Sequence, residues 1–136
     1  MKRLVLLFLM AGFVVSCTKL TSEQPVPNAS GYLGKWEMKH RYGGNILPAD
    51  TIYPTGNGNI LLLKSDFTYT SYAKGNVVSR GIYQITKKGY TLNQTTYDEI
   101  LFDGNLSGAL ISLNGGLLTI KPLLADISTV DYQLVQ

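Results

Sequence analysis

Short apolar or alternating runs, separated by turn residues, recur along the chain from about residue 31 onwards. No segment in this part carries the period of an amphipathic helix, and short runs bounded by turn residues are typical of strands. The segments with this strand pattern are residues 32–42, 60–63, 67–72, 77–85, 90–93, 99–102, 109–113, 117–121 and 130–134. The pattern therefore predicts an all-β domain of eight or nine strands.

The stretches between these runs carry residues that favour chain reversal. Turns are predicted at Lys64-Ser65-Asp66, Lys74-Gly75-Asn76, Lys87-Lys88-Gly89, Asp103-Gly104-Asn105 and Asn114-Gly115-Gly116. Consecutive strands joined by short turns favour an up-and-down meander, and closing it into a barrel removes both exposed edges. We therefore expect an antiparallel up-and-down β-barrel of about eight strands, with an open sandwich as the alternative.

The first sixteen residues have a different pattern. Lys2 and Arg3 precede an apolar run over residues 4–15, and the small residue Ser16 follows. Cations, an apolar run and a small residue are the three parts of a secretory signal. The run is shorter than the roughly 20 residues that span a bilayer. The pattern therefore predicts an export signal over residues 1–16 rather than a permanent transmembrane helix.

Residues 14–17, Val-Val-Ser-Cys, resemble the lipobox of bacterial lipoproteins. In that family the cysteine sulfur receives a diacylglycerol, the chain is cut before the cysteine, and the new amino group is usually acylated. The resemblance implies a lipid anchor at Cys17, with acyl chains such as palmitate in a membrane of the cell envelope, the outer membrane foremost. The alternative is an ordinary signal whose cleavage leaves a free cysteine.

Residues 17–30 are polar, contain two prolines and show no period, which indicates a flexible tether. The barrel domain is then residues 31–136. Because Cys17 is the only cysteine, the chain can form no intramolecular disulfide and no cysteine-based metal cluster. The net charge of +3 includes Lys2 and Arg3 of the expected signal. No basic stripe interleaved with aromatics remains, so nucleic acid is not an expected partner.

Residues able to carry out chemistry are few and scattered. His40 is the only histidine, and no group of His, Asp and Glu has the spacing of metal ligands. Asp98 and Glu99 are adjacent, so on a strand their carboxylates point to opposite faces. Nucleophile and phosphate-loop motifs are also missing. We therefore expect a protein that is not an enzyme and has no metal or cofactor.

The segment Gly34-Lys35-Trp36 resembles the Gly-x-Trp opening of lipocalins. Together with residues 63–69, residues 81–85 and a late tyrosine strand ending at Leu134, it resembles the lipocalin-like domains of Bacteroidetes-type lipoproteins. The resemblance implies that Gly34 and Trp36 close the barrel base. Phe67 departs from this pattern, because such hairpins often have glycine after the aspartate.

A lipocalin-like barrel implies a small, mainly apolar ligand. Tyrosines offer the flat faces and polar tips that line small-molecule pockets. The long segment of residues 43–57 is either a lid with an apolar underside or a loop packed on the barrel wall. The candidate ligand-binding residues are Tyr69, Tyr83, Ile85, Tyr90, Ile52 and Tyr53. The alternative function is a filled barrel acting as a structural or protein-interaction module of the envelope, for which the sequence names no partner.

Overall fold

The computed structural model describes residues 31–45, 50–104 and 107–135. The expected signal over residues 1–16 and the tether over residues 17–30, with Cys17, lie outside the described residues. Within the described ranges no helix is long and apolar enough to cross a membrane. The secondary structure consists of β1 (Gly34–Tyr42), β2 (Asp50–Ile52), β3 (Ile60–Leu63), β4 (Thr68–Ala73), β5 (Asn76–Leu92), β6 (Thr95–Phe102), β7 (Ala109–Asn114), β8 (Leu117–Pro122) and β9 (Thr129–Val135).

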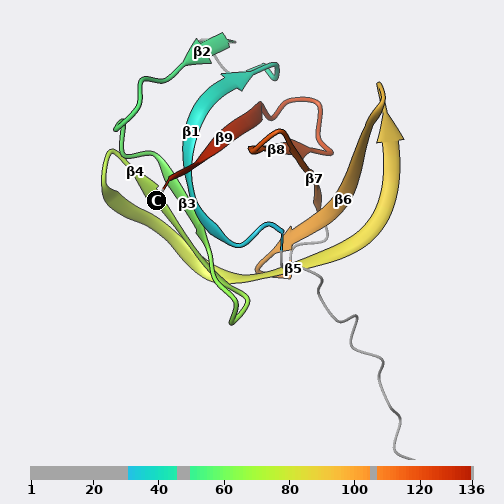
Figure 1. The fold of residues 1–136 in the computed structure, drawn as a ribbon, viewed down its shortest axis with the longest axis horizontal. Helices are drawn as coiled ribbons and strands as arrows, with labels where there is room; N and C mark the ends of the chain where they lie inside the picture. The colour runs from blue at the N-terminus through green and yellow to red at the C-terminus, as the bar shows by residue number, and fades with distance from the viewer. Residues whose placement is uncertain (1–30, 46–49, 105–106, 136) are drawn as a thin grey trace, which may run out of the picture.

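The strands form one antiparallel sheet that closes on itself (Figure 1). From β3 to β9 each strand pairs with the next along the chain, and β9 pairs with β1 from Lys35↔Val135 to Tyr42↔Thr129. The other edge of β1 is shared, because its first half pairs with β3 and its second half with β2. The prediction of a closed antiparallel barrel is confirmed, with eight strands in the wall and β2 as an additional strand.

Strand β5 is much longer than its neighbours and belongs to two hairpins. Its first part pairs with β4 from Asn76 to Ile82, and its second part pairs with β6 from Tyr83 to Leu92. The predicted turn at Lys87-Lys88-Gly89 is wrong, since the register shifts between Thr86 and Tyr90 without reversal of the chain. Gly89 has a φ of +63°, and this left-handed conformation accommodates a bulge inside the strand.

The chain reverses instead at Asn93 and Gln94, both in the left-handed region with φ of +49° and +64°. Strand β6 therefore begins at Thr95, four residues before the predicted start at Glu99. The resulting β5–β6 hairpin is the longest in the barrel and curves away from the other strands in Figure 1. A two-residue turn with two positive φ values matches the right-handed twist of the strands that it joins.

The inner face of the barrel carries the core. Alternation along the strands brings large side chains of β1, β3, β4, β5, β6, β7 and β8 together there. The buried members are Trp36, Leu61, Leu63, Tyr69, Tyr83, Ile85, Ile100, Ile111, Leu118 and Ile120. Each is exposed by 9% or less, so the inner face is occupied by contacting side chains.

The β3–β4 turn holds Phe67, rather than a glycine, in a left-handed conformation. The Phe67 amide donates to the Lys64 carbonyl at 3.2 Å, and Phe67 itself has a φ of +61°. The Phe67 ring contacts Tyr83 edge-on, with ring centroids 6.1 Å apart. A left-handed non-glycine residue costs roughly 1–2 kcal/mol, which this aromatic contact offsets in part.

Candidate functional site

Three of the six predicted ligand-binding residues lie together in the core. Tyr69, Tyr83 and Ile85 are all buried on the inner face. The Tyr83 hydroxyl donates to the Lys64 carbonyl at 2.6 Å, and burial, followed by the charge of Asp66, raises the Tyr83 pKa. The Tyr69 hydroxyl lies between Ser79 Oγ at 2.8 Å and Asp103 Oδ2 at 2.7 Å. The polar atoms of both tyrosines thus bind the protein itself.

The other three candidates are spread over the surface. Tyr90 is 51% exposed on the outer part of the β5–β6 hairpin, and Ile52 is 81% exposed on β2. Strand β2 runs along β1, where Ile52 pairs with His40, so Ile52 provides no apolar underside for a lid. Tyr53 is half-buried, and its amide donates to the Lys39 carbonyl at 2.8 Å. Residues 46–49 of the expected lid segment lie outside the described residues.

Gly34 and Trp36 are placed together at the start of β1. The Trp36 indole is buried and donates to the Tyr32 carbonyl at 2.8 Å. Gly34 has a φ of +142°, and a Cβ there would lie 2.7 Å from Leu134 Cδ1 and 3.7 Å from Trp36 Nε1. Glycine therefore allows β9 and the indole to approach this backbone closely.

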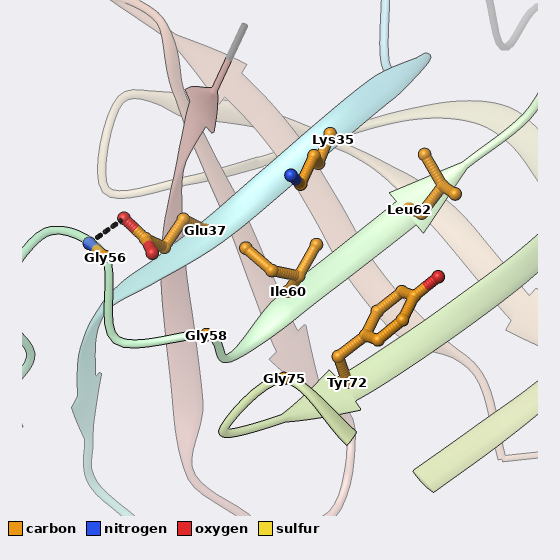
Figure 2. A pocket seen from close by; sticks show the side chains of 8 residues that line it. All are labelled: Lys35, Glu37, Gly56, Gly58, Ile60, Leu62, Tyr72 and Gly75. Carbon is orange, nitrogen blue, oxygen red and sulfur yellow. Dashed lines mark hydrogen bonds between the residues drawn. The ribbon is translucent and has the colours of Figure 1, made fainter. Parts of the chain in front are cut away.

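The outer face of the wall carries a pocket that is lined by none of the six predicted ligand-binding residues. It has a volume of about 440 Å³ and lies over β1, β3 and the β4–β5 turn (Figure 2). Apolar side chains alternate outwards here, opposite to the core residues of the same strands. The lining residues are Lys35, Glu37, Gly56, Gly58, Ile60, Leu62, Tyr72 and Gly75.

Glu37 is the most buried charged residue of this pocket. Its side chain is only 4% exposed, and Oε2 accepts the Gly56 amide at 3.0 Å, the contact drawn in Figure 2. A buried carboxylate requires hydrogen-bond donors to offset its lost hydration. Glu37 therefore fixes the segment between β2 and β3, which forms one rim of the pocket.

An asparagine network holds the same rim in place. Asn57 Nδ2 donates to the Met38 carbonyl at 2.9 Å, and Asn57 Oδ1 accepts from the Asn59 amide at 2.9 Å. The Gly75 amide donates to the Gly58 carbonyl at 2.9 Å, which ties this rim to the β4–β5 turn. A Cβ at Gly58 would lie 2.7 Å from that Gly75 nitrogen. The pocket is consequently preformed by asparagine side-chain and backbone contacts.

A second hollow of about 530 Å³ lies on the outer face of β4 and β5. Tyr72 lines both hollows, so they adjoin at this residue. The second hollow is more polar, and its lining residues are Lys64, Thr68, Tyr69, Thr70, Tyr72, Arg80, Gly81 and Ile82.

His40 lies apart from both hollows. Its Nε2 is 2.7 Å from Asp50 Oδ1, its Nδ1 is 3.9 Å from Asp131 Oδ2, and its ring stacks on Tyr42. These contacts connect β2 and β9 to β1. Within the described ranges, no group of three or more His, Cys, Asp and Glu side chains is arranged to hold a metal ion.

Part of the outer pocket could have been found by the alternation that located the core. Trp36 faces inwards, so Lys35 and Glu37 face outwards, and Ile60 and Leu62 alternate with Leu61 and Leu63 in the same way. An apolar residue at every position of β3 gives this strand an apolar surface on both faces.

Comparison with protein-family models, with curated proteins and with solved structures found no match to this chain.

Proposed function

We propose that this chain is a lipid-anchored lipoprotein of the cell envelope that binds a small, mainly apolar ligand on the outer wall of its barrel. The observation that carries the binding proposal is the preformed outer pocket of about 440 Å³. Small-molecule sites are concave, largely apolar and about 300–1,000 Å³ in volume. Ile60, Leu62 and Tyr72 supply the apolar surface, while the inner face is occupied by the core.

The anchor is proposed from the lipobox-like residues before Cys17. A single acyl chain gives only marginal membrane binding, so several chains on one cysteine are needed for stable attachment. Such a tether leaves the barrel free to meet ligands at the membrane surface. Under this proposal the barrel binds and presents a ligand and performs no catalysis.

The anchor is tested by expressing the full chain in a bacterium that processes lipoproteins, supplied with an alkyne analogue of palmitate. We expect label and membrane fractionation for the native chain, and loss of both for Cys17→Ser. Label that persists in Cys17→Ser, or a native chain that is exported without label, would contradict the anchor. Thr18→Ser serves as a neighbouring control that retains the cysteine.

The pocket is tested by native mass spectrometry after exposure to a lipid extract of the host. Because every strand that the structure describes lies within residues 34–135, a chain beginning at residue 18 retains all of these strands. We expect a discrete added mass that Leu62→Trp abolishes by filling the pocket. Val78→Trp is the matched control, since Val78 is exposed on β5 and lines neither hollow. An added mass that survives Leu62→Trp would place the ligand elsewhere.

The occupied inner face also favours a second function, a filled barrel that serves as a structural or protein-interaction module. Its signature is a single envelope protein recovered with the chain in fixed ratio, together with a bare mass after exposure to lipid extract. That pair of results would replace the ligand-binding proposal.

A further inference from the structure

The outer faces of four neighbouring strands align a row of side chains that ends in a cation on each side. Lys35 on β1 pairs with Leu62 on β3, Leu62 pairs with Thr70 on β4, and Thr70 pairs with Arg80 on β5. Directly paired residues share a face of the sheet, and neighbouring strands lie about 4.8 Å apart. The row therefore crosses both outer hollows.

A second row gives this face its apolar surface. Glu37 pairs with Ile60, and Ile60 pairs with Tyr72. Ile82 lies on the far side of the Leu62–Thr70–Arg80 row, where it pairs with Thr68; it is 62% exposed and lines the second hollow. The apolar surface of the first hollow therefore borders the more polar second hollow where Leu62 pairs with Thr70, an arrangement that suits an elongated ligand with one apolar and one polar end.

The charges of the two hollows differ. In the first hollow Lys35 lies on the same wall as the buried carboxylate of Glu37. The second hollow is lined by Lys64, Arg80 and the hydroxyl-bearing Thr68 and Thr70, with no carboxylate residue in its lining. Among the described residues, the ion pairs join only His40, Lys88 and their carboxylate partners. Lys64 and Arg80 are therefore available to an anion.

Asp66 is the acidic residue closest to Lys64 in the sequence, and its carboxylate already accepts two hydrogen bonds. Asp66 Oδ1 accepts the Thr68 amide at 3.0 Å and the Thr68 hydroxyl at 2.6 Å. These bonds direct the carboxylate into its own turn. Lys64 and Arg80 form no direct ion pair in the described structure, although the charge of Lys64 acts on the nearby Asp66 carboxylate.

We propose that this outer face binds an anionic amphiphile, with its alkyl chain over Ile60, Leu62 and Tyr72 and its head group between Lys64 and Arg80. The inference rests on the proposed outer ligand site and names the chemical class of its ligand. Thr70 adds a hydroxyl beside the two cations, whereas the Thr68 hydroxyl is donated to Asp66. Guanidinium groups bind carboxylate and phosphate in a forked geometry. A fatty acid and a phosphate-bearing lipid share this chemistry.

The test compares four soluble probes with the same alkyl chain: decanoate, decyl phosphate, decyl maltoside and decyltrimethylammonium, each below its micelle concentration. Binding to the chain beginning at residue 18 is followed by NMR shifts of the Leu62, Thr70 and Arg80 amides. We expect both anions to bind about tenfold more tightly than the neutral probe, because the exposed Lys64 and Arg80 each contribute an ion contact. Added salt should reduce this difference.

Matched variants separate charge from shape. Lys64→Gln with Arg80→Gln should abolish the preference for anions and leave maltoside binding unchanged. Lys87→Gln with Lys121→Gln removes two cations that line neither hollow and should keep the preference. The relative affinities of decanoate and decyl phosphate then identify which head group the hollow favours.

Equal binding of the neutral and anionic probes, or an anion preference that survives loss of Lys64 and Arg80, would overturn the proposed ligand class. Shifts that still map to Leu62 in that case would leave the outer ligand site itself intact. If no probe binds, the anionic amphiphile is likewise rejected. The outer site is then judged by the host-extract experiment with Leu62→Trp, which does not depend on head-group charge.

Discussion

The Asp103 carboxylate occupies the space in which a side chain at Gly81 would lie. A Cβ at Gly81 would overlap Asp103 Oδ1, and that oxygen accepts the Ile82 amide at 3.0 Å. The other carboxylate oxygen accepts the Tyr69 hydroxyl at 2.7 Å. Gly81 thus allows the residue after β6 to join β4 and β5 through one side chain.

We expect Gly81→Ala to lower the free energy of unfolding by about 2–3 kcal/mol, because the displaced carboxylate leaves the Ile82 amide and Tyr69 hydroxyl without their acceptor. Urea unfolding followed by circular dichroism measures the change. In an Asp103→Ala background the same substitution should cost much less, since no carboxylate remains to be displaced. Equal costs in the two backgrounds would show that the overlap is not the cause.

Gly34→Ala should destabilise the barrel by about 2 kcal/mol, because the new methyl group meets Leu134 and the φ of +142° is unfavourable for alanine. Gly31→Ala is the control, as its Cβ would lie at an ordinary 4.0 Å from Leu113 Cδ2. Thermal unfolding can be followed by the fluorescence of Trp36, the only tryptophan. Similar melting temperatures for the two variants would refute the close approach of Leu134.

Stability should fall in alkali through Tyr132. Burial, and secondarily Tyr53, raises the pKa of Tyr132 to about 12. A folded pKa above the unfolded value of about 10 gives stability that is complete below pH 10 and is lost as the pH rises towards 12. The loss is about 1.4 kcal/mol per pH unit in that window. Urea unfolding at pH 10 and at pH 12 measures this loss, and Tyr132→Phe should lack it. An unchanged dependence of stability on pH in Tyr132→Phe would contradict the assignment to Tyr132.

Asp66 should contribute to the loss of stability at low pH. Hydrogen bonds from the Thr68 hydroxyl and then the Thr68 amide hold the Asp66 pKa below its ordinary value. A depressed folded pKa gives stability that is present above the unfolded pKa and lost as the pH falls through the folded pKa. NMR titration of the Asp66 carboxyl carbon measures this pKa, and Thr68→Val should raise it. The same pKa in both proteins would exclude the hydroxyl as its cause.

At the outer pocket, Glu37→Ala should release the rim by removing the acceptor of the Gly56 amide. Hydrogen exchange at Gly56 should accelerate by about tenfold, the equivalent of one net hydrogen bond. Glu37→Gln keeps a carbonyl oxygen and should show a smaller increase, because the neutral bond is weaker. Unchanged protection in Glu37→Ala would mean that the asparagine network alone fixes this segment.

The strand pattern of the barrel could be predicted because most of its signals are local. Leu61 and Leu63 alternate within a short apolar run, and the Asn114-Gly115-Gly116 turn supplies two positive φ values where the hairpin needs them. Lys87-Lys88-Gly89 was predicted wrongly because a glycine beside polar residues suits a bulge as well as a turn. Only the pairing of Tyr90 on β5 with Tyr97 on β6 distinguishes the bulge from the turn.

The outer pocket was harder to predict because a remote segment creates it. Alternation places Ile60, Leu62 and Tyr72 on one face, but it does not say whether water or protein covers them. The answer depends on Glu37 binding Gly56 and on Gly58 meeting Gly75, contacts that lack a sequence signature. The same limit applies to Tyr69 and Tyr83, because a tyrosine side chain, with its apolar ring and polar hydroxyl, suits a binding site or a core equally well.

The pairing of Lys35 with Val135 brings the first and last strands of the barrel side by side. Linking the two ends there and opening the chain at Gly115-Gly116 would give a circular permutant that begins with β8 and ends with β7. All pairs of neighbouring strands would be kept, and only the covalent turn between β7 and β8 would be lost. Exposed turns tolerate such cuts well. The fold is thus specified by the cyclic order of paired strands around the barrel, and this order is the same whether the chain begins at β1 or at β8.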